Sequence, residues 1–268
     1  MYFYRYILLI LLGIICHGCN NRADSPEAYE HLKSFSQGTM EKDKYFKLLA
    51  QEFPDNDYAW MERSVPYNKR GDLENGMKFL TKAVKINPGG NVGYRGYVML
   101  YMMHDYEQAL KDFKRLLELS SDKNPVAWGE NLHKLIGLTF LLQNEYDTAL
   151  NYLDKGIILT TEEFSEAYVE QRSFLYKSYA HFHLKNYDSA LVTLQKALAI
   201  ENRFPEAHYL KAKIYKNKGL YQQALASINT SDTLFNKYGA ATNAYYEMPY
   251  QLYASQINEL KDQINKAL

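Results

Sequence analysis

Apolar residues recur along most of the chain at intervals of three and four, which is the spacing of one face of an α-helix. Ala190, Leu191, Leu194, Ala197 and Leu198 form one such face. The apolar stretches come in pairs that are separated by short polar segments. The pattern therefore predicts an all-α chain built from helix–turn–helix units.

A short phrase recurs at the predicted start of the second helix of each unit. Its copies read LENGM, YEQAL, YDTAL, YDSAL and YQQAL, and they begin at Leu73, Tyr106, Tyr146, Tyr187 and Tyr221. The spacings are 33, 40, 41 and 34 residues. Two of them fit a period of about 34 residues, which is typical of one class of helical repeat. The other two carry polar insertions near residues 120–126 and 160–167.

These units resemble tetratricopeptide (TPR) repeats. Small residues such as Ala190 and Ala224 lie where two helices must approach closely, and Pro88 ends one hairpin before the next begins. The resemblance implies an all-α, TPR-like superhelical stack of antiparallel helix pairs, an α-solenoid. The first full unit places large and small residues as the family does, at Trp60, Ser64, Tyr67, Gly71, Gly76, Leu80, Ala83 and Pro88.

The repeats define the expected organisation of the chain. Five TPR-like hairpins occupy residues 57–232, a degenerate leading hairpin precedes them at 26–56, and C-terminal capping helices follow at 233–268. The hairpins are expected at 57–88, 90–121, 130–161, 171–202 and 205–232.

The tail carries an apolar stripe beyond Pro249. Its members recur at steps of three and four, as on one helix face. A helix over 250–268 would either cap the last hairpin or meet a partner helix, which includes that of a second copy in a homo-oligomer. The stripe consists of Tyr250, Tyr253, Ile257, Leu260, Ile264 and Leu268.

The N-terminus reads as a targeting segment. Arg5 precedes an unbroken apolar run over 6–16, which is too short to cross a bilayer but suits a signal peptide. The end of this segment resembles a bacterial lipobox, in which Gly18 precedes a lipidated Cys19. We therefore expect a signal peptide at 1–18, an anchor at Cys19 and a tether over 19–25. This implies an outer-membrane lipoprotein of the cell envelope that faces the periplasm or the surface.

Composition and motifs narrow the range of possible functions. The chain has 31 Lys and Arg against 31 Asp and Glu, so it lacks the basic excess typical of nucleic-acid binders. The sequence contains no Walker loop and no GxGxxG, GxSxG or HExxH motif. We expect no catalytic residues, no cofactor and no metal, and therefore not an enzyme.

The resemblance also implies a ligand surface on the first helix of each hairpin, which lines the concave face of such a stack. The best-known peptide-binding members hold a C-terminal carboxylate with Lys and Asn. Lys134 matches one such Lys, whereas Leu138 stands where the paired Asn would be. Mapped onto this chain, the candidate partner-binding residues are Tyr58, Met61, Tyr94, Val98, Tyr101, Asn131, Lys134, Leu138, Arg172, Leu175, Tyr179, Phe182, Tyr209 and Lys213.

Two functions compete on this evidence. The first is a lipid-anchored envelope scaffold or adaptor that holds a protein or peptide partner in the concave groove, with membrane attachment through the lipid alone. The alternative is a glycan or small-molecule binding module, because the chain has 25 Tyr and aromatic faces suit sugar rings.

Overall fold

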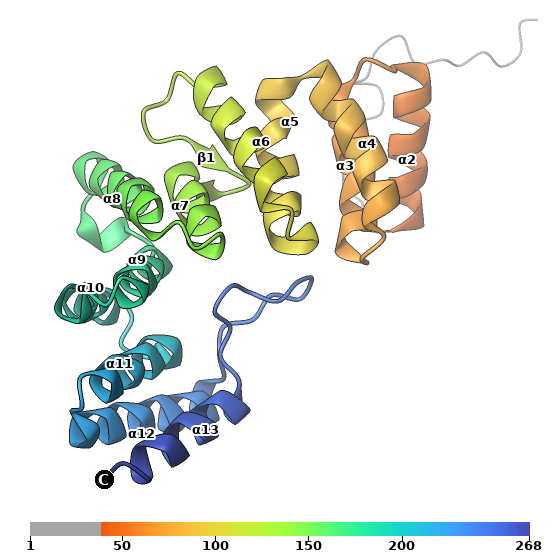
Figure 1. The fold of residues 1–268 in the computed structure, drawn as a ribbon. Coiled ribbons are helices and arrows are strands. Elements are labelled where there is room, and N and C mark those ends of the chain that lie inside the picture. Colours follow the sequence, from red (N-terminus) through yellow and green to blue (C-terminus); the bar gives the residue numbers. More distant parts are fainter. Residues whose placement is uncertain (1–38) are drawn as a thin grey trace, which may run out of the picture.

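A computed structural model of the chain describes residues 39–268. The expected signal peptide, Cys19, the tether and the first part of the leading hairpin lie outside the described residues. Within them, helices stack in antiparallel pairs along a curved array (Figure 1). The prediction of an all-α, TPR-like superhelical stack is confirmed.

The helices follow one another with short connections. A π-helical turn, Met99–Met103, extends α5, and a 3-10 turn, Glu166–Tyr168, precedes α9. The α-helices are α2 (Met40–Glu52), α3 (Asp57–Lys69), α4 (Leu73–Ile86), α5 (Pro88–Val98), α6 (Tyr106–Leu119), α7 (Leu132–Leu142), α8 (Tyr146–Glu163), α9 (Gln171–His183), α10 (Tyr187–Ile200), α11 (Pro205–Asn217), α12 (Tyr221–Tyr238) and α13 (Ala254–Asn265).

Each recurring phrase opens a helix at its first residue, namely α4, α6, α8, α10 and α12. Two positions before each phrase, the backbone adopts a positive φ, which reverses the chain between the paired helices. Only two of these five turn residues are glycine, so the residue types alone do not indicate the shared turn geometry. The five are Gly71, His104, Asn144, Lys185 and Gly219, with φ between 55° and 82°.

Small residues permit the close packing of each pair. A Cβ at Gly96 of α5 would lie 2.6 Å from a ring carbon of Phe113 on α6. Each helix packs chiefly against its own hairpin partner and next against the neighbouring hairpin. The result is one continuous apolar core from α3 to α11, and a second core that joins α11 and α12 to α13.

The insertion between the second and third hairpins folds into a small β-hairpin. Strands β1 (Val126–Ala127) and β2 (Glu130–Asn131) pair in antiparallel fashion. Trp128 and Gly129 both have positive φ, the backbone of a two-residue turn of the primed type. This turn presses the Trp128 ring onto Tyr94 of α5, with the ring centroids 3.9 Å apart.

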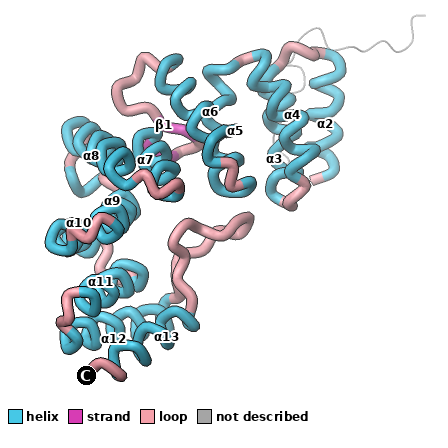
Figure 2. The backbone as a smooth tube through the Cα atoms, viewed as in Figure 1, coloured by secondary structure: helices cyan, strands magenta, loops and turns pink. Residues whose placement is uncertain are grey.

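Residues 233–268, where capping helices are expected, contain the end of α12 and one further helix. A single helix, α13, packs against α12. It begins at Ala254, so Tyr250 does not belong to its apolar stripe. Ile257, Leu260 and Ile264 are buried, and Leu268 is exposed. Figure 2 shows that the long segment between α12 and α13 is irregular and reaches back towards the middle of the array.

Candidate functional site

Residues 239–253, which we call the strap, lie along the inner side of the curved array. The strap leaves α12 at Gly239, whose φ of 75° turns the chain away from the helix. Its course towards α5 and α7 is visible in Figure 1. The backbone N–H of Ala241 donates a hydrogen bond to Glu206 on α11 (3.1 Å), and Leu252 returns the chain to the core beside α13. The strap therefore occupies the concave face.

Tyr246 is the first aromatic anchor of the strap. Its ring stacks on Tyr101 with centroids 4.8 Å apart, and its hydroxyl lies 2.6 Å from that of Tyr97. Tyr101 also donates a hydrogen bond to Glu130 of β2 (3.0 Å). Burial raises the pKa of Tyr101 well above its ordinary value, and so does the charge of Glu130. These phenols remain neutral donors at physiological pH.

Tyr250 is the second anchor. Its ring lies on Tyr179 of α9, with centroids 3.8 Å apart and an interplanar angle of 18°. Its backbone has a φ of 57°, a conformation in which the side chain crowds the following carbonyl group. Tyr250 therefore holds its ring in the groove at a conformational cost.

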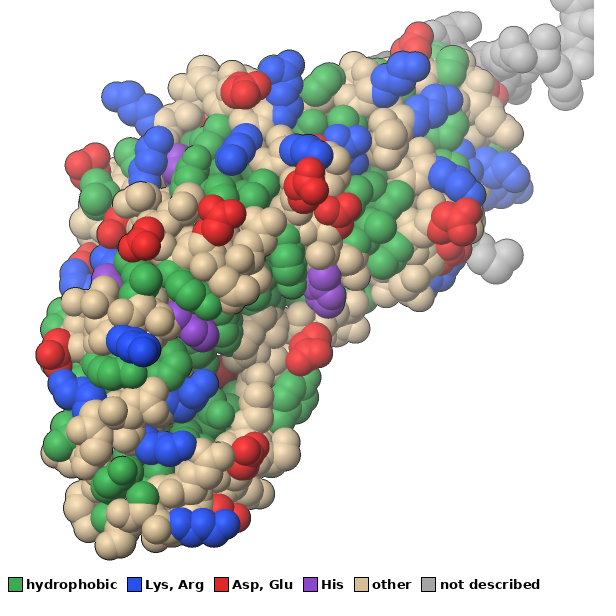
Figure 3. All heavy atoms as spheres, in the orientation of Figure 1, with side chains coloured by type: hydrophobic (Ala, Val, Ile, Leu, Met, Phe, Trp, Pro, Cys, Tyr) green, Lys and Arg blue, Asp and Glu red, His purple; other side chains and the backbone are tan. Residues whose placement is uncertain are grey.

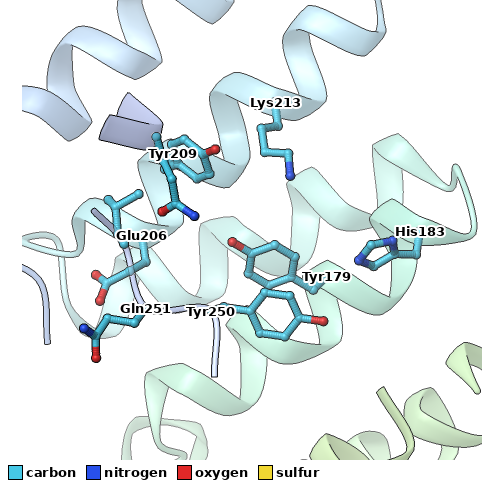
Figure 4. A pocket seen from close by; sticks show the side chains of 9 residues that line it. Tyr179, His183, Glu206, Tyr209, Lys213, Tyr250 and Gln251 are labelled. Carbon is cyan, nitrogen blue, oxygen red and sulfur yellow. The ribbon is translucent and has the colours of Figure 1, made fainter. Parts of the chain in front are cut away.

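A cavity of about 150 Å³ opens beside this second stack (Figure 4). Tyr179 and His183 approach it from α9, and Glu206, Tyr209 and Lys213 approach it from α11. The strap closes one side. The lining is Tyr179, His183, Glu206, Tyr209, Lys213, Tyr250, Gln251, Leu252 and Gln256.

The three cations that the sequence assigned to the groove lie in different environments. Lys134 is buried and forms ion pairs with Glu130 (2.6 Å) and Glu170. Burial lowers its pKa, but the two carboxylates outweigh burial and raise the pKa overall. Arg172 is also buried and contacts Glu206 at 3.2 Å, a carboxylate that is only 1% exposed. Both charges are therefore neutralised within the fold.

Lys213 differs, because no carboxylate among the described residues pairs with it. Its ammonium group lies 5.1 Å from the centroid of the Phe182 ring and 5.8 Å from that of Tyr209. Burial, assisted by the charge of Lys216, lowers the pKa of Lys213. Lys213 therefore presents a cation to the cavity that is balanced only by aromatic faces.

Several candidate ligand residues serve the fold instead. Tyr94 is covered by Trp128 and accepts a hydrogen bond from Asn68 (3.1 Å), and Asn131 caps α7 through Lys134 N–H (3.0 Å). Tyr101 and Tyr179 are only 3% and 4% exposed, so the expected open aromatic groove is filled. Tyr58 packs edge-on to Phe46, and Met61, Val98, Leu138 and Leu175 pack in or against the core. Of the candidates, the structure brings Tyr179, Tyr209 and Lys213 together around the cavity, beside Phe182.

Most of the residues that fill this face carry no signal in the sequence. Tyr246 lies in a segment without periodicity, Glu206 and His183 belong to no motif, and the spacing of Tyr250 predicts a helical stripe instead of a place in the groove. One signal was present. The stretch from Gly239 to Asn243 is rich in turn-forming and small residues, and Pro249 excludes a regular helix. Together they indicated a long non-helical connection in front of α13.

The surface offers no single-sign patch on the face shown in Figure 3, where Lys and Arg side chains alternate with Asp and Glu. Between residues 39 and 268, no group of three or more His, Cys, Asp or Glu side chains could hold a metal ion. Over the same range, every helix is too short or too polar to cross a bilayer.

Sequence and structure comparisons agree with this architecture. The family described as Tetratricopeptide repeat matches residues 58–89 and 205–238, and a second, described as TPR repeat, matches 179–219. The chain thus contains TPR repeats. A TPR repeat-containing protein of Methanocaldococcus jannaschii is 25% identical over 197 residues, which cover 69% of this chain. The chain spans about a third of that relative's length, since the match covers 33% of it.

Two solved structures share the fold at low sequence identity. The APC/C hetero-tetramer Cut9–Hcn1 superimposes with a TM-score of 0.63 over 84% of this chain and 39% of the matched chain, at 16% identity. YrrB, described as a TPR protein with an unusual peptide-binding site, gives a TM-score of 0.54 over 72% of this chain and 93% of its own, at 15% identity.

Proposed function

We propose that the protein is an adaptor that holds a protein partner by an extended peptide segment in the concave groove of its TPR array. One observation carries this proposal. An irregular, non-helical stretch of the chain itself, the strap, already lies in that groove and is held by two ring stacks and a backbone hydrogen bond to Glu206. The inner face is therefore chemically suited to an irregular polypeptide with aromatic side chains.

The fold neighbours support the same class of function. Cut9 was solved in complex with Hcn1, and YrrB is described by its peptide-binding site. Both likenesses concern the fold, and the groove contacts of the present chain supply the chemical argument.

The proposal includes attachment to the bacterial cell envelope. Its support is the sequence of the N-terminus, where an apolar run ends at Gly18 and Cys19. Lipid on Cys19 would place the TPR array at the membrane surface, with the partner-binding face free to meet an envelope protein. The outer membrane is the proposed location, with a periplasmic or surface-exposed array.

The glycan-binding alternative is less well supported. A sugar ring needs a free aromatic face, but Tyr101 and Tyr179 are each stacked by a strap tyrosine. The cavity beside Tyr179 is lined by Lys213 and the buried carboxylate of Glu206, and it measures only about 150 Å³. These features favour a peptide over a carbohydrate.

Site-specific photo-crosslinking in the native envelope tests the adaptor function. A photoreactive phenylalanine analogue replaces Tyr209, on the inner face, in one variant of the full chain. In the control it replaces Val192, which is 63% exposed on α10, the outer helix of its pair. We expect a discrete protein adduct from position 209 and none from position 192. Absence of any protein adduct from position 209, or equal adducts from both positions, would contradict the proposal.

A further inference from the structure

The strap is attached to the inner face much more loosely than the helices are attached to one another. None of its residues from Gly239 to Gln251 is fully buried, although Tyr246 and Tyr250 pack against the core, and Leu252 is the first buried residue. It forms no regular structure and has few backbone hydrogen bonds to the array. Segments with few buried contacts and a solvated backbone open at low free-energy cost. The strap therefore has the character of a bound peptide more than of a core element.

Two tyrosines give the strap its position. Tyr246 and Tyr250 are four residues apart, and each ring stacks on a buried tyrosine of the array, Tyr101 and Tyr179 respectively. The other strap tyrosines differ from them. Tyr245 is 48% exposed, and the ammonium nitrogen of Lys69 lies 5.0 Å from the centroid of its ring. Tyr253 is 40% exposed at the start of α13. Stacked aromatic pairs stabilise a contact by more than the area they bury, so Tyr246 and Tyr250 dominate the attachment.

The attachment at Tyr250 carries a cost that an external peptide would escape. Its left-handed backbone is unfavourable for a residue other than glycine, because the Cβ atom crowds the following carbonyl group. The two ends of the strap are held by α12 and α13, whereas an external peptide has free ends. The open cavity next to Tyr250 also gives an incoming peptide a first point of contact, at Tyr209 and Lys213, before the strap leaves.

Resting on the function proposed above, we infer that the strap is an intramolecular stand-in for the partner, which reaches its site by displacing it. The partner segment is a non-helical peptide with two aromatic side chains four residues apart, which take the places of Tyr246 and Tyr250. Because the strap is tethered, its effective concentration at the groove is on the order of millimolar. In the free chain the strap then occupies the groove. A peptide can displace it only if its dissociation constant for the open groove is well below this effective concentration.

The competing interpretation is that the strap is a permanent brace, needed to hold the curvature of the array. The two interpretations differ in what a separate strap peptide does. A displaceable strap leaves behind a folded groove that binds the same sequence supplied in trans. A brace leaves behind a damaged array that does not.

The experiment measures binding of a fluorescently labelled peptide with the sequence of residues 240–253 by anisotropy. Three forms of the full chain are compared, namely the natural chain, Tyr246→Ala/Tyr250→Ala and the matched control Tyr245→Ala. We expect the double variant to bind at least about 10-fold more tightly than the natural chain, since the intramolecular competitor is gone. Tyr245→Ala should resemble the natural chain, and a peptide with both anchor tyrosines changed to alanine should not compete.

Thermal unfolding of the same proteins completes the test. If the double variant melts at a lower temperature, added peptide should raise the melting temperature towards that of the natural chain. The inference is overturned if the folded double variant does not bind the peptide, if all three chains bind it equally, or if the double variant unfolds and the peptide does not restore it. A crosslinked partner at position 209 in the presence of any of those results would leave the adaptor function standing and remove only the displaceable strap.

Discussion

The ring of Tyr250 lies against the ring of Tyr179 with centroids 3.8 Å apart, although the two residues belong to opposite parts of the fold. Tyr179 comes from α9, in the inner layer of helices, whereas Tyr250 comes from an irregular segment beyond the last hairpin. The contact turns a residue that a TPR array would leave open to ligands into part of its core.

Truncating either buried tyrosine of the inner face should destabilise the fold. Tyr101→Ala and Tyr179→Ala each remove a stacked, buried ring, and such truncations cost about 3–5 kcal/mol. Tyr238→Ala is the matched control, because that ring is 49% exposed at the end of α12 and should change stability by less than about 0.5 kcal/mol. Urea denaturation measures all three. If both inner-face variants have the same free energy of unfolding as the natural chain, these rings are not core residues.

The turn before each second helix should respond to backbone substitutions in opposite directions. A Cβ at Gly219 would meet nothing within 4 Å, so Gly219→Ala should cost about 1–2 kcal/mol through its positive φ alone. At the equivalent turn, Lys185 has a φ of 61° and is exposed, so Lys185→Gly should be neutral or stabilising by up to about 1 kcal/mol. Equal losses in both variants would argue against a common turn geometry.

Acid should destabilise the protein through His133. This residue is 1% exposed on α7 and neither ring nitrogen has a hydrogen-bond partner. Burial, with a smaller contribution from Lys155, lowers its pKa from 6.5 to about 4. In the unfolded chain His133 therefore binds a proton near pH 6.5, whereas in the folded chain it binds one only near pH 4. The stability contributed by neutral His133 is fully present above pH 6.5 and is lost as the pH falls towards 4.

The expected loss from His133 is up to about 3 kcal/mol over this window. Urea denaturation at pH 7.5 and pH 4.5 measures it in the natural chain and in His133→Gln. The variant should show a smaller difference between the two pH values. An unchanged difference would assign the acid sensitivity to other groups.

Lipid attachment should depend on one atom, the sulfur of Cys19. Cys19→Ser should remain uncleaved or without lipid and should leave the detergent phase on phase separation. Cys16→Ser is the matched control, since Ile15 before Cys16 is bulky and branched and fits a lipobox poorly. Processing and membrane attachment that survive in Cys19→Ser would rule out the lipoprotein assignment.

The helices were predictable because their determinants are local. A phrase that begins with Tyr146 or Tyr187 carries its own apolar spacing and small packing residue, and the structure opens a helix at each of these tyrosines. The same holds for the hairpins as a whole, whose partners are adjacent in sequence. Because the phrase occurs five times along the chain, a pattern that is weak in any one copy becomes a strong indication of helical hairpins.

The site was less predictable because its determinants are distant. Lys134 and Arg172 lie on α7 and α9 as the helical register predicts, but the carboxylates that pair with them from outside their own hairpins, Glu170 and Glu206, are more than 30 residues away in sequence. The occupation of the groove depends on the strap, whose sequence has no periodic pattern to read. Tyr250 was assigned to a helical stripe because it continues the spacing of Ile257 and Leu260, yet Pro249 and the positive φ of Tyr250 end that pattern.

The strap also changes how the array must unfold. In an ordinary solenoid each repeat touches only its neighbours, so the chain can unravel from either end one hairpin at a time. Here Tyr246 contacts Tyr97 across 149 residues of sequence. Fraying of the last hairpin therefore strains a contact with the second, and the part of the array between these two hairpins becomes thermodynamically coupled. Such long-range contacts raise the contact order and slow folding. Under a pulling force, the array should yield in one cooperative step while the strap is docked and hairpin by hairpin after it is released.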